Sequence, residues 1–274
     1  MTPDPLGDLD IAHLLADAAR AAILPWFRHP GLGAENKAGM GAAASFDPVT
    51  VADRAAEQAM RALLAEHRPD DAILGEEFGP RPGTSGRTWV LDPIDGTRAF
   101  LSGAPTWGVL IALSDGTVGE NGPLLGVIDQ PYTGERFVGA RGVAALSGPF
   151  GTSALATRAT ARLADAILFS TFPEVGSADE LVGFRAVADR VRLTRYGLDC
   201  YAYGLLAAGQ IDLVIEAGLN AYDIQAPMAV IAAAGGIVTD WRGGPAAGGG
   251  RVLAAANRDL HAAALAILSR VALP

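Results

Sequence analysis

Cysteine is almost absent from the 274-residue chain, because Cys200 is the only one. An internal disulfide bond and a cysteine-rich zinc site are therefore excluded, and we expect the protein to work in the reducing cytoplasm. Basic residues are also few: 21 lysines and arginines stand against 30 aspartates and glutamates, so the formal net charge is −9. Because no basic excess is available to neutralise a phosphate backbone, we expect no nucleic-acid partner.

Long apolar runs are missing too. No run of about 18 apolar residues occurs, so we expect no transmembrane helix and no membrane partner. The first ten residues contain Asp4, Asp8 and Asp10 but no lysine or arginine, which is the opposite of the charge pattern in a secretory or transit signal. Half of the residues are hydrophobic and 19% are charged. This composition predicts a folded globular protein of one or two domains.

The apolar pattern predicts two helices, then a sheet, then alternating helices and strands. Helices are expected over residues 8–28 and 51–67, with a mobile Gly/Ala-rich loop over 30–48 between them. Short strands at 72–74, 88–91, 107–113, 125–128 and 136–139 favour an antiparallel or mixed sheet. Beyond about residue 150, the alternation favours an α/β half. In that half, strands are expected at 167–170, 192–196, 211–216, 236–240 and 251–255, and helices at 177–190, 199–208, 224–234 and 258–271.

The most informative motif covers residues 89–97, Trp-Val-Leu-Asp-Pro-Ile-Asp-Gly-Thr. An apolar strand is expected to end in Asp92, because Pro93 cannot continue a central β-ladder. The turn that follows places the carboxylates of Asp92 and Asp95 on one side, and the carbonyl group of Ile94 can point the same way. Oxygen ligands alone favour Mg²⁺, Mn²⁺ or Ca²⁺ over zinc. An ordinary Asp-Pro and Asp-Gly turn is the alternative.

Two other expected strands also end in acidic residues. Gly75, Glu76 and Glu77 directly follow the strand 72–74, and Glu216 ends the strand 211–216. Sites in α/β layers usually gather at strand ends, so these acids are candidates for the same site. Adjacent acids on a surface loop are common, which is the ordinary explanation for the glutamate pair.

Three expected helix starts carry polar residues that have two interpretations. Gly96 and Thr97 open a short helix, and backbone N–H groups at a helix start are suited to bind phosphate. Asp223 opens a later helix, and Thr50 with Asp53 has the spacing of a capping box. Ordinary helix capping explains each of these residues locally.

Taken together, four motifs resemble the inositol monophosphatase superfamily of Mg²⁺-dependent phosphatases. They are Asp-Pro-Val-Thr-Val-Ala-Asp (47–53), Gly-Glu-Glu (75–77), the motif at 89–97 and Tyr-Asp-Ile-Gln-Ala-Pro (222–227), and the segment 234–241 adds to the match. The resemblance implies the α/β fold of inositol monophosphatase and fructose-1,6-bisphosphatase, a layered αβαβα sandwich. It also implies a single phosphatase domain over residues 1–274, with halves of about 1–150 and 151–274, which assembles as a homodimer.

The resemblance assigns metal ligands residue by residue. Glu76, Asp92 and the carbonyl group of Ile94 are expected to hold the first Mg²⁺. Asp92, Asp95 and Asp223 are expected to hold the second, so that Asp92 bridges the two ions. Two such ions would neutralise the phosphate of a small phosphorylated substrate, activate a water molecule and stabilise the leaving alkoxide.

Other residues are assigned supporting roles by the same resemblance. Thr97, hydrogen-bonded to Asp53, is expected to orient the attacking water together with Glu76. Glu77 is expected to support the metal ligands or to hold a third, weaker ion. Gly96 and Thr97 are expected to contact the substrate through their backbone N–H groups.

A finer similarity points to the histidinol-phosphate phosphatase branch of the superfamily. It lies in segments 92–100, 105–113, 129–132 and 197–204. The substrate of that branch, L-histidinol phosphate in histidine biosynthesis, carries an ammonium group and an imidazole that can be cationic. A pocket for it needs carboxylates beyond those used by metal ions, and Asp199 and Glu216 are placed to supply them. A helix N-cap is the alternative role for Asp199.

Three alternatives remain open at this point. The substrate can instead be inositol-1-phosphate, which needs neutral hydroxyl partners, or a 3′(2′),5′-bisphosphate nucleotide. A non-catalytic binding protein of the same fold would be marked by the loss of a ligand, but all of them are present. A lysine of the family can approach the metal site, and the long loop Lys37–Phe46 leaves the role of Lys37 open.

Overall fold

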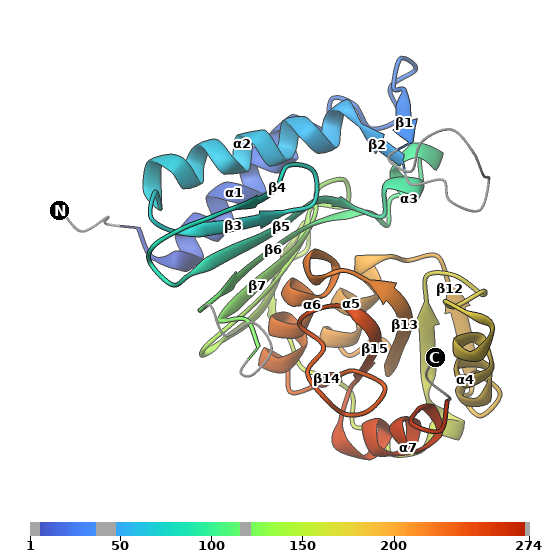
Figure 1. Ribbon diagram of the computed structural model, residues 1–274. Helices are drawn as coiled ribbons and strands as arrows, with labels where there is room; N and C mark the ends of the chain where they lie inside the picture. The colour runs from blue at the N-terminus through green and yellow to red at the C-terminus, as the bar shows by residue number, and fades with distance from the viewer. Residues whose placement is uncertain (1–5, 37–47, 116–121, 272–274) are drawn as a thin grey trace.

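The computed structural model describes residues 6–36, 48–115 and 122–271. These residues form five layers in the order helix, sheet, helix, sheet, helix (Figure 1). The helical layers are α1 (Asp8–Ile23) with α2 (Val51–His67), α5 (Cys200–Ala207) with α6 (Ala221–Ala233), and α4 (Ala178–Ala188) with α7 (Arg258–Leu268). None of the helices in these ranges is long and apolar enough to cross a bilayer.

Two sheets separate the helical layers. The larger sheet has the strand order β10-β9-β8-β7-β6-β5-β3-β4, and of its described pairs only β3–β5 is parallel. The smaller sheet has the order β12-β11-β13-β15-β14, in which β11 runs parallel to both of its neighbours. The strands are β3 (Ala72–Gly75), β4 (Gly79–Arg81), β5 (Thr88–Asp95), β6 (Gly108–Ser114), β7 (Leu125–Gln130), β8 (Glu135–Ala140), β9 (Val143–Gly148), β10 (Gly151–Ala154), β11 (Ile167–Ser170), β12 (Leu193–Tyr196), β13 (Leu213–Leu219), β14 (Ile237–Thr239) and β15 (Gly250–Ala255). The expected mixed sheet and α/β half are both confirmed.

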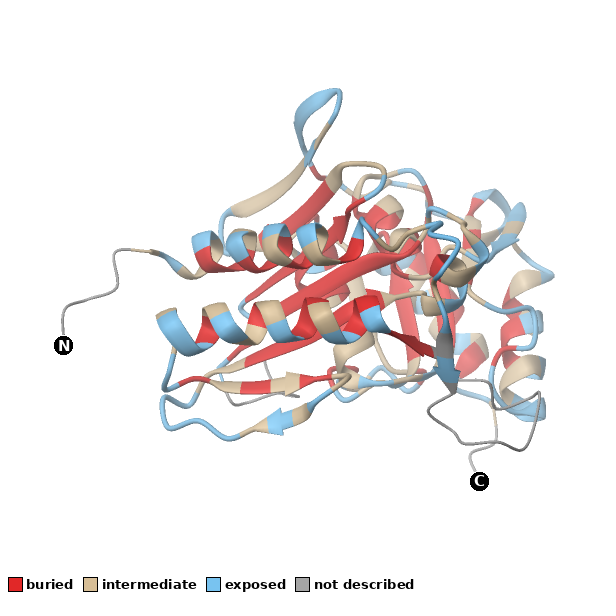
Figure 2. Ribbon diagram, turned by 90° about the horizontal axis from the view of Figure 1, so that it is seen from above, coloured by how far each residue is buried: buried red, intermediate tan, exposed pale blue. Residues whose placement is uncertain are grey.

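Three hydrophobic cores fill the spaces between the five layers. The first lies under α1 and α2 around Met60 and Trp89, the second between the two sheets around Phe137 and Tyr203, and the third beneath α4 and α7 around Phe184. Figure 2 shows that the strands of the larger sheet are mostly buried, while its covering helices alternate between buried and exposed stretches. The predicted αβαβα sandwich is therefore confirmed.

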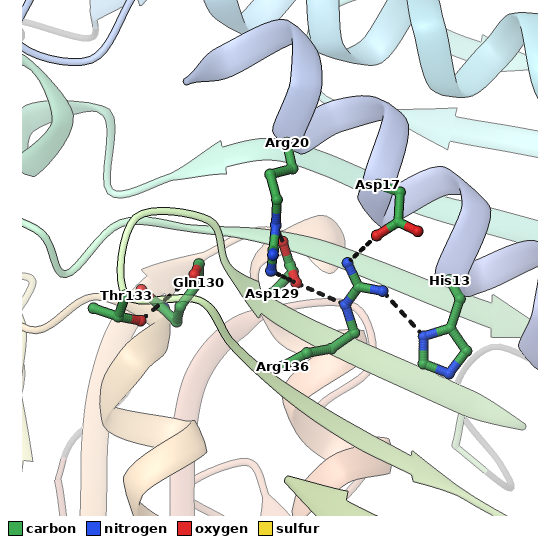
Figure 3. Close-up of polar contacts among 7 residues, drawn as sticks. All are labelled: His13, Asp17, Arg20, Asp129, Gln130, Thr133 and Arg136. Atoms are coloured by element: carbon green, nitrogen blue, oxygen red, sulfur yellow. Dashed lines mark hydrogen bonds and ion pairs between the residues drawn. The ribbon is translucent and has the colours of Figure 1, made fainter. Parts of the chain in front are cut away.

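A buried ion network fastens α1 to the larger sheet (Figure 3). Asp129 of β7 is fully buried and accepts hydrogen bonds from Arg20 Nη2 and Arg136 Nε, both at 2.7 Å. Arg136 also reaches Asp17 Oδ1 at 2.6 Å and His13 Nδ1 at 3.1 Å on α1. An ionised carboxylate is costly to bury without a partner, so this network favours one placement of α1 on the strands.

The first expected helix extends too far at its C-terminal end. The prediction was 8–28, but α1 ends at Ile23 and residues 24–28 form successive turns. Pro25 is the physical reason, because its ring and its missing N–H group interrupt helical hydrogen bonding. The strands β1 (Ala34–Asn36) and β2 (Pro48–Thr50) pair in antiparallel fashion, so the ends of the expected loop 30–48 are also corrected. Lys37 and the rest of the 37–46 loop lie outside the described residues.

Three strands of the larger sheet were not predicted: the short edge strand β4, and β9 and β10 at the opposite edge. β9 and β10 extend the sheet beyond β8 and carry the first half of the chain to Ala154. Their sequence is rich in glycine, alanine and serine and lacks the apolar alternation that marks a half-buried strand. Their half-buried or exposed positions explain that weak pattern, because an edge of a sheet needs few apolar side chains.

Candidate active site

A cavity of about 280 Å³ opens between the end of β5 and the start of α6. Its lining residues are Glu76, Asp92, 94–98, 170–172, Val175, Gly176, Asp199, Cys200, Tyr203, 216–220, Tyr222 and Asp223. Nine of the eleven predicted site residues are in this set, and Asp53 and Glu77 are the two that are not. Segments far apart in the sequence thus meet around one cavity.

The end of β5 differs from the prediction, because the strand does not stop at Asp92. β5 continues to Asp95 across a register shift, with Asp92 opposite Leu110 and Asp95 opposite Gly108 on β6. Pro93 lies inside this irregularity, where its missing N–H group costs no ladder hydrogen bond. Asp92 and Asp95 both line the cavity, as the motif predicted. The backbone that places them there is a register shift within β5, and not the predicted turn after Asp92.

Three aspartates form the centre of the site. Carboxylate oxygens of Asp92, Asp95 and Asp223 lie within 4.8 Å of one another. A backbone N–H group holds one oxygen of each: Ile94 N donates to Asp92 Oδ1 at 3.0 Å, Cys200 N to Asp95 Oδ2 at 2.6 Å, and Asn220 N to Asp223 Oδ2 at 2.6 Å. These bonds orient each carboxylate before any ligand arrives.

Asp223 occupies a different helix position from the one expected. Asn220 is the N-cap of α6, and Asp223 is the third residue of the helix. Its side chain reaches back to the N-cap amide, so the residues form a capping box rather than a simple cap. This geometry still directs Asp223 into the cavity.

The three carboxylates repel one another in a buried setting. Burial, then the charges of Glu76 and Asp95, raises the pKa of Asp92 well above its ordinary value. Burial, then the charges of Asp199 and Asp223, does the same to the pKa of Asp95. Burial raises the pKa of Asp223 to about 7, although its bond to Asn220 opposes the shift. A divalent cation would remove this repulsion.

The predicted hydrogen bond between Thr97 and Asp53 is not present. The Thr97 hydroxyl group donates to the Ile94 carbonyl oxygen at 3.1 Å. Asp53 Oδ2 accepts from the backbone and the hydroxyl group of Thr50, while Asp53 Oδ1 is buried and has no hydrogen-bond partner among the described residues. Burial raises the pKa of Asp53 to about 6, against the opposing Thr50 bonds. The capping box of α2 is confirmed, and it uses only one of the two carboxylate oxygens.

Asp199 lies in the cavity wall with a strained backbone. Its φ of 47° is rare for a residue other than glycine, and such strain is typical of functional sites. Gly96 permits this position, because a Cβ atom there would lie 2.8 Å from Asp199 Cγ. Burial, then the charge of Glu216, raises the pKa of Asp199 to about 6, so the group is largely ionised at neutral pH. It is the first residue before α5, but its side chain makes no capping bond.

Both carboxylate oxygens of Glu216 accept hydrogen bonds from the protein, which was not expected. Its Oε1 atom accepts from the backbone and hydroxyl groups of Thr171, and its Oε2 atom accepts from Tyr203 Oη at 2.7 Å. Burial raises the pKa of Glu216. The side chain is therefore part of the cavity framework, with little accepting capacity left for a substrate.

Residues 170–176 were not predicted as part of the site. Phe172 in this segment is 46% exposed, lines the cavity and lies under the Arg98 guanidinium group, 5.1 Å from its ring centre. The sequence offered one signal, an aromatic residue two positions after the strand 167–170. Without the sheet order, nothing placed that strand end beside Asp95.

The comparisons with known proteins agree with this geometry. Residues 8–272 match the sequence profile of the inositol monophosphatase family. The chain belongs to that family. The bifunctional phosphatase IMPL2 of Arabidopsis thaliana, a chloroplastic protein, is 39% identical over 93% of this chain and 73% of its own length. The histidinol-phosphatase of Streptomyces coelicolor is 37% identical over 98% of this chain and 99% of its own.

A solved structure of an inositol monophosphatase from Zymomonas mobilis has the same fold. It is 41% identical, covers 96% of this chain and 97% of its own, and has a TM-score of 0.81. Members of the inositol monophosphatase family hydrolyse phosphomonoesters, and this chain is an enzyme of that class.

The family is metal-dependent, and the residues of the cavity fit a divalent cation. Asp92, Asp95 and Asp223 offer only oxygen ligands, which suit hard cations such as Mg²⁺. The pKa values of these three aspartates are raised by burial and by the neighbouring acids, and a bound cation would offset both effects. Three converging carboxylates, each oriented by an amide, are therefore consistent with a metal centre.

Proposed function

We propose that this protein is a Mg²⁺-dependent phosphatase that hydrolyses L-histidinol phosphate to L-histidinol and phosphate. The observation that carries the substrate assignment is Asp199. It is an acidic side chain in the wall of the cavity, additional to the three-aspartate cluster. It accepts a long hydrogen bond of 3.5 Å from the Thr106 hydroxyl group. A carboxylate held in this way suits a cationic substrate group.

The metal ligands in this proposal are those that the family resemblance implies. Glu76, Asp92 and the Ile94 carbonyl group would hold one Mg²⁺, and Asp92, Asp95 and Asp223 a second. Bound ions would supply charge neutralisation, an acidified water and a stabilised leaving group. Glu77 lies outside the cavity wall, which favours two ions over three.

Other residues at the cavity would position the water molecule and the substrate. Glu76 and Thr97 line the cavity beside the aspartate cluster, where they can orient a water molecule for in-line attack on phosphorus. The unpartnered Oδ1 atom of Asp53 is the acceptor that we assign to the Thr97 hydroxyl group in the working enzyme. Asp199 would pair with the substrate ammonium or imidazolium group, and the exposed ring of Phe172 offers a face for the imidazole.

A comparison of three substrates tests the proposal. The purified protein is assayed with Mg²⁺ and histidinol phosphate, inositol-1-phosphate or 3′-phosphoadenosine-5′-phosphate, and kcat/KM is measured for each. We expect the highest value for histidinol phosphate. A higher value for either other ester contradicts the substrate assignment and leaves the metal-site assignment in place.

Asp199→Asn is expected to reduce this preference selectively. Asparagine keeps the size and shape of the side chain, but it cannot pair with a cation as an anion. We expect kcat/KM for histidinol phosphate to fall about tenfold or more, the value of a charge-assisted hydrogen bond. The value for inositol-1-phosphate, which carries no cation, should change much less. Equal losses for both esters would assign Asp199 to the framework of the site.

Inositol-1-phosphate is the second candidate substrate. The observation in its favour is the 41% identity with the inositol monophosphatase of Zymomonas mobilis. Its hydroxyl groups require neutral or accepting partners, and Thr171 and Asn220 in the cavity wall are available as such partners. The three-substrate comparison separates the two candidates.

A further inference from the structure

Glu57 is a fully buried carboxylate on the face of α2 that packs against the larger sheet. It follows Asp53 by four residues on α2 and lies beside the buried side chains of Ala56 and Met60. Its own side chain is 0% exposed. Burial of an ionised group is costly unless several partners stabilise it, so the partners of Glu57 indicate its role.

Its partners are the backbone of the loop that carries Glu76. Glu57 Oε2 accepts from the amide of Glu77 at 2.7 Å, and Glu57 Oε1 accepts from the amide of Phe78 at 3.2 Å. Arg61, one helical turn further on, donates from Nε to Glu57 Oε1 at 2.7 Å. Arg61 also donates from Nη2 to the carbonyl group of Gly79. One ion pair on α2 thus contacts both sides of the loop.

The loop leaves no backbone amide free. Residues 76–78 join β3 to β4, with Gly75 opposite Gly79. The Glu76 amide donates to the Leu91 carbonyl oxygen at 3.1 Å, and the next two amides donate to Glu57. Gly75 allows the carboxylate to come this close, because a Cβ atom there would lie 2.0 Å from Glu57 Oε1. The 76–78 loop is therefore held by hydrogen bonds to Glu57, and the absence of a side chain at Gly75 makes room for them.

We infer that Glu57, held by Arg61, is a positioning residue that fixes the 76–78 loop so that Glu76 faces the metal site before an ion binds. Residues that support metal ligands contribute to affinity by lowering the cost of ordering them. The inference depends on the metal dependence of the family and on the place of Glu76 in the cavity, and it holds for any phosphate ester as substrate.

Glu57→Gln tests the inference through metal binding. Glutamine has one accepting oxygen where glutamate has two, so it cannot satisfy two amides and Arg61 together. We expect the dissociation constant of Mn²⁺, measured by electron paramagnetic resonance without substrate, to rise about tenfold, as for other residues that support metal ligands. At saturating metal, kcat should change less than about threefold, because no group that touches the substrate is lost.

Glu66→Gln is the matched control, since it makes the same chemical change on the same helix at an exposed position. It should bind Mn²⁺ as the parent does. Arg61→Lys, which keeps the charge but loses the forked contact to Glu57 and Gly79, should give an intermediate rise. A folded Glu57→Gln protein with the parent dissociation constant would overturn the inference.

A measurement on the parent protein alone covers the case in which Glu57→Gln does not fold. In the absence of metal, hydrogen exchange at the amides of Glu77 and Phe78 should be slow, because both are bonded to a buried carboxylate. Exchange at the rate of an unprotected loop would show that the loop is not fixed before metal binding, and would likewise overturn the inference.

Discussion

Replacing Asp92 with asparagine is expected to abolish turnover and to make the metal-free protein more stable. Asp92 is the predicted shared ligand of both ions, so its loss should lower kcat/KM by about 10³-fold or more, corresponding to several kcal/mol of lost charge stabilisation. Asparagine keeps an oxygen that can accept from the Ile94 amide, and it removes a buried charge next to Asp95 and Asp223. The melting temperature without metal should therefore rise.

The opposite signs of the two effects make this variant informative. A variant that loses activity by unfolding would lower the melting temperature, whereas the loss of a repelled metal ligand raises it. Asp179→Asn, at an exposed position in the first turn of α4, is the control and should leave both quantities nearly unchanged. Retention of more than a tenth of the parent kcat/KM by Asp92→Asn would contradict the assignment of Asp92.

Stability without divalent ions is expected to fall as pH rises from 5 to 8. Burial, the largest cause for each group, raises the pKa of Asp223 to about 7 and the pKa of Asp199 to about 6. In the unfolded chain these groups ionise near pH 4. Between the two values the folded chain holds protons that the unfolded chain has released, so raising the pH favours unfolding. Each pKa unit corresponds to about 1.4 kcal/mol.

Mg²⁺ should reverse this trend, because it binds the ionised carboxylates of the folded chain. We expect Mg²⁺ to raise the melting temperature by several degrees at pH 8 and much less at pH 5, in calorimetric scans with Mg²⁺ or with a chelator. Burial lowers the pKa of His13 and His261, which acts in the opposite direction, and this contribution cancels when the parent is compared with Asp92→Asn. A Mg²⁺ effect of equal size at both pH values would contradict the electrostatic description of the cluster.

Most of the site residues predicted from the sequence line the cavity. Asp92, Asp95 and Glu76 stand in short motifs at or near strand ends, and four such motifs in order led to the family and to the layered fold. These motifs are local, so their residue types and spacing are visible without coordinates. The backbone that carries them was less visible: Pro93 predicted a strand end, whereas a register shift in β5 accommodates it.

Features that depend on tertiary contact were missed. Glu57 has the helical spacing of an ordinary polar residue four positions after Asp53, and only the packing of α2 against the β3–β4 loop gives it partners. Phe172 becomes part of the cavity because β11 and β13 are neighbours in the smaller sheet. Glu216 was correctly placed in the cavity, but its bonds to Thr171 and Tyr203 were not visible from the sequence.

The location of bound manganese tests the metal centre most directly. Crystals grown with Mn²⁺ in place of Mg²⁺ would be measured near the manganese absorption edge, so that anomalous peaks mark the ions. We predict two peaks in the cavity, both in contact with Asp92, one extending to Glu76 and the other to Asp95 and Asp223. Manganese bound only at other acidic positions, with none in contact with Asp92, would contradict the proposed metal centre.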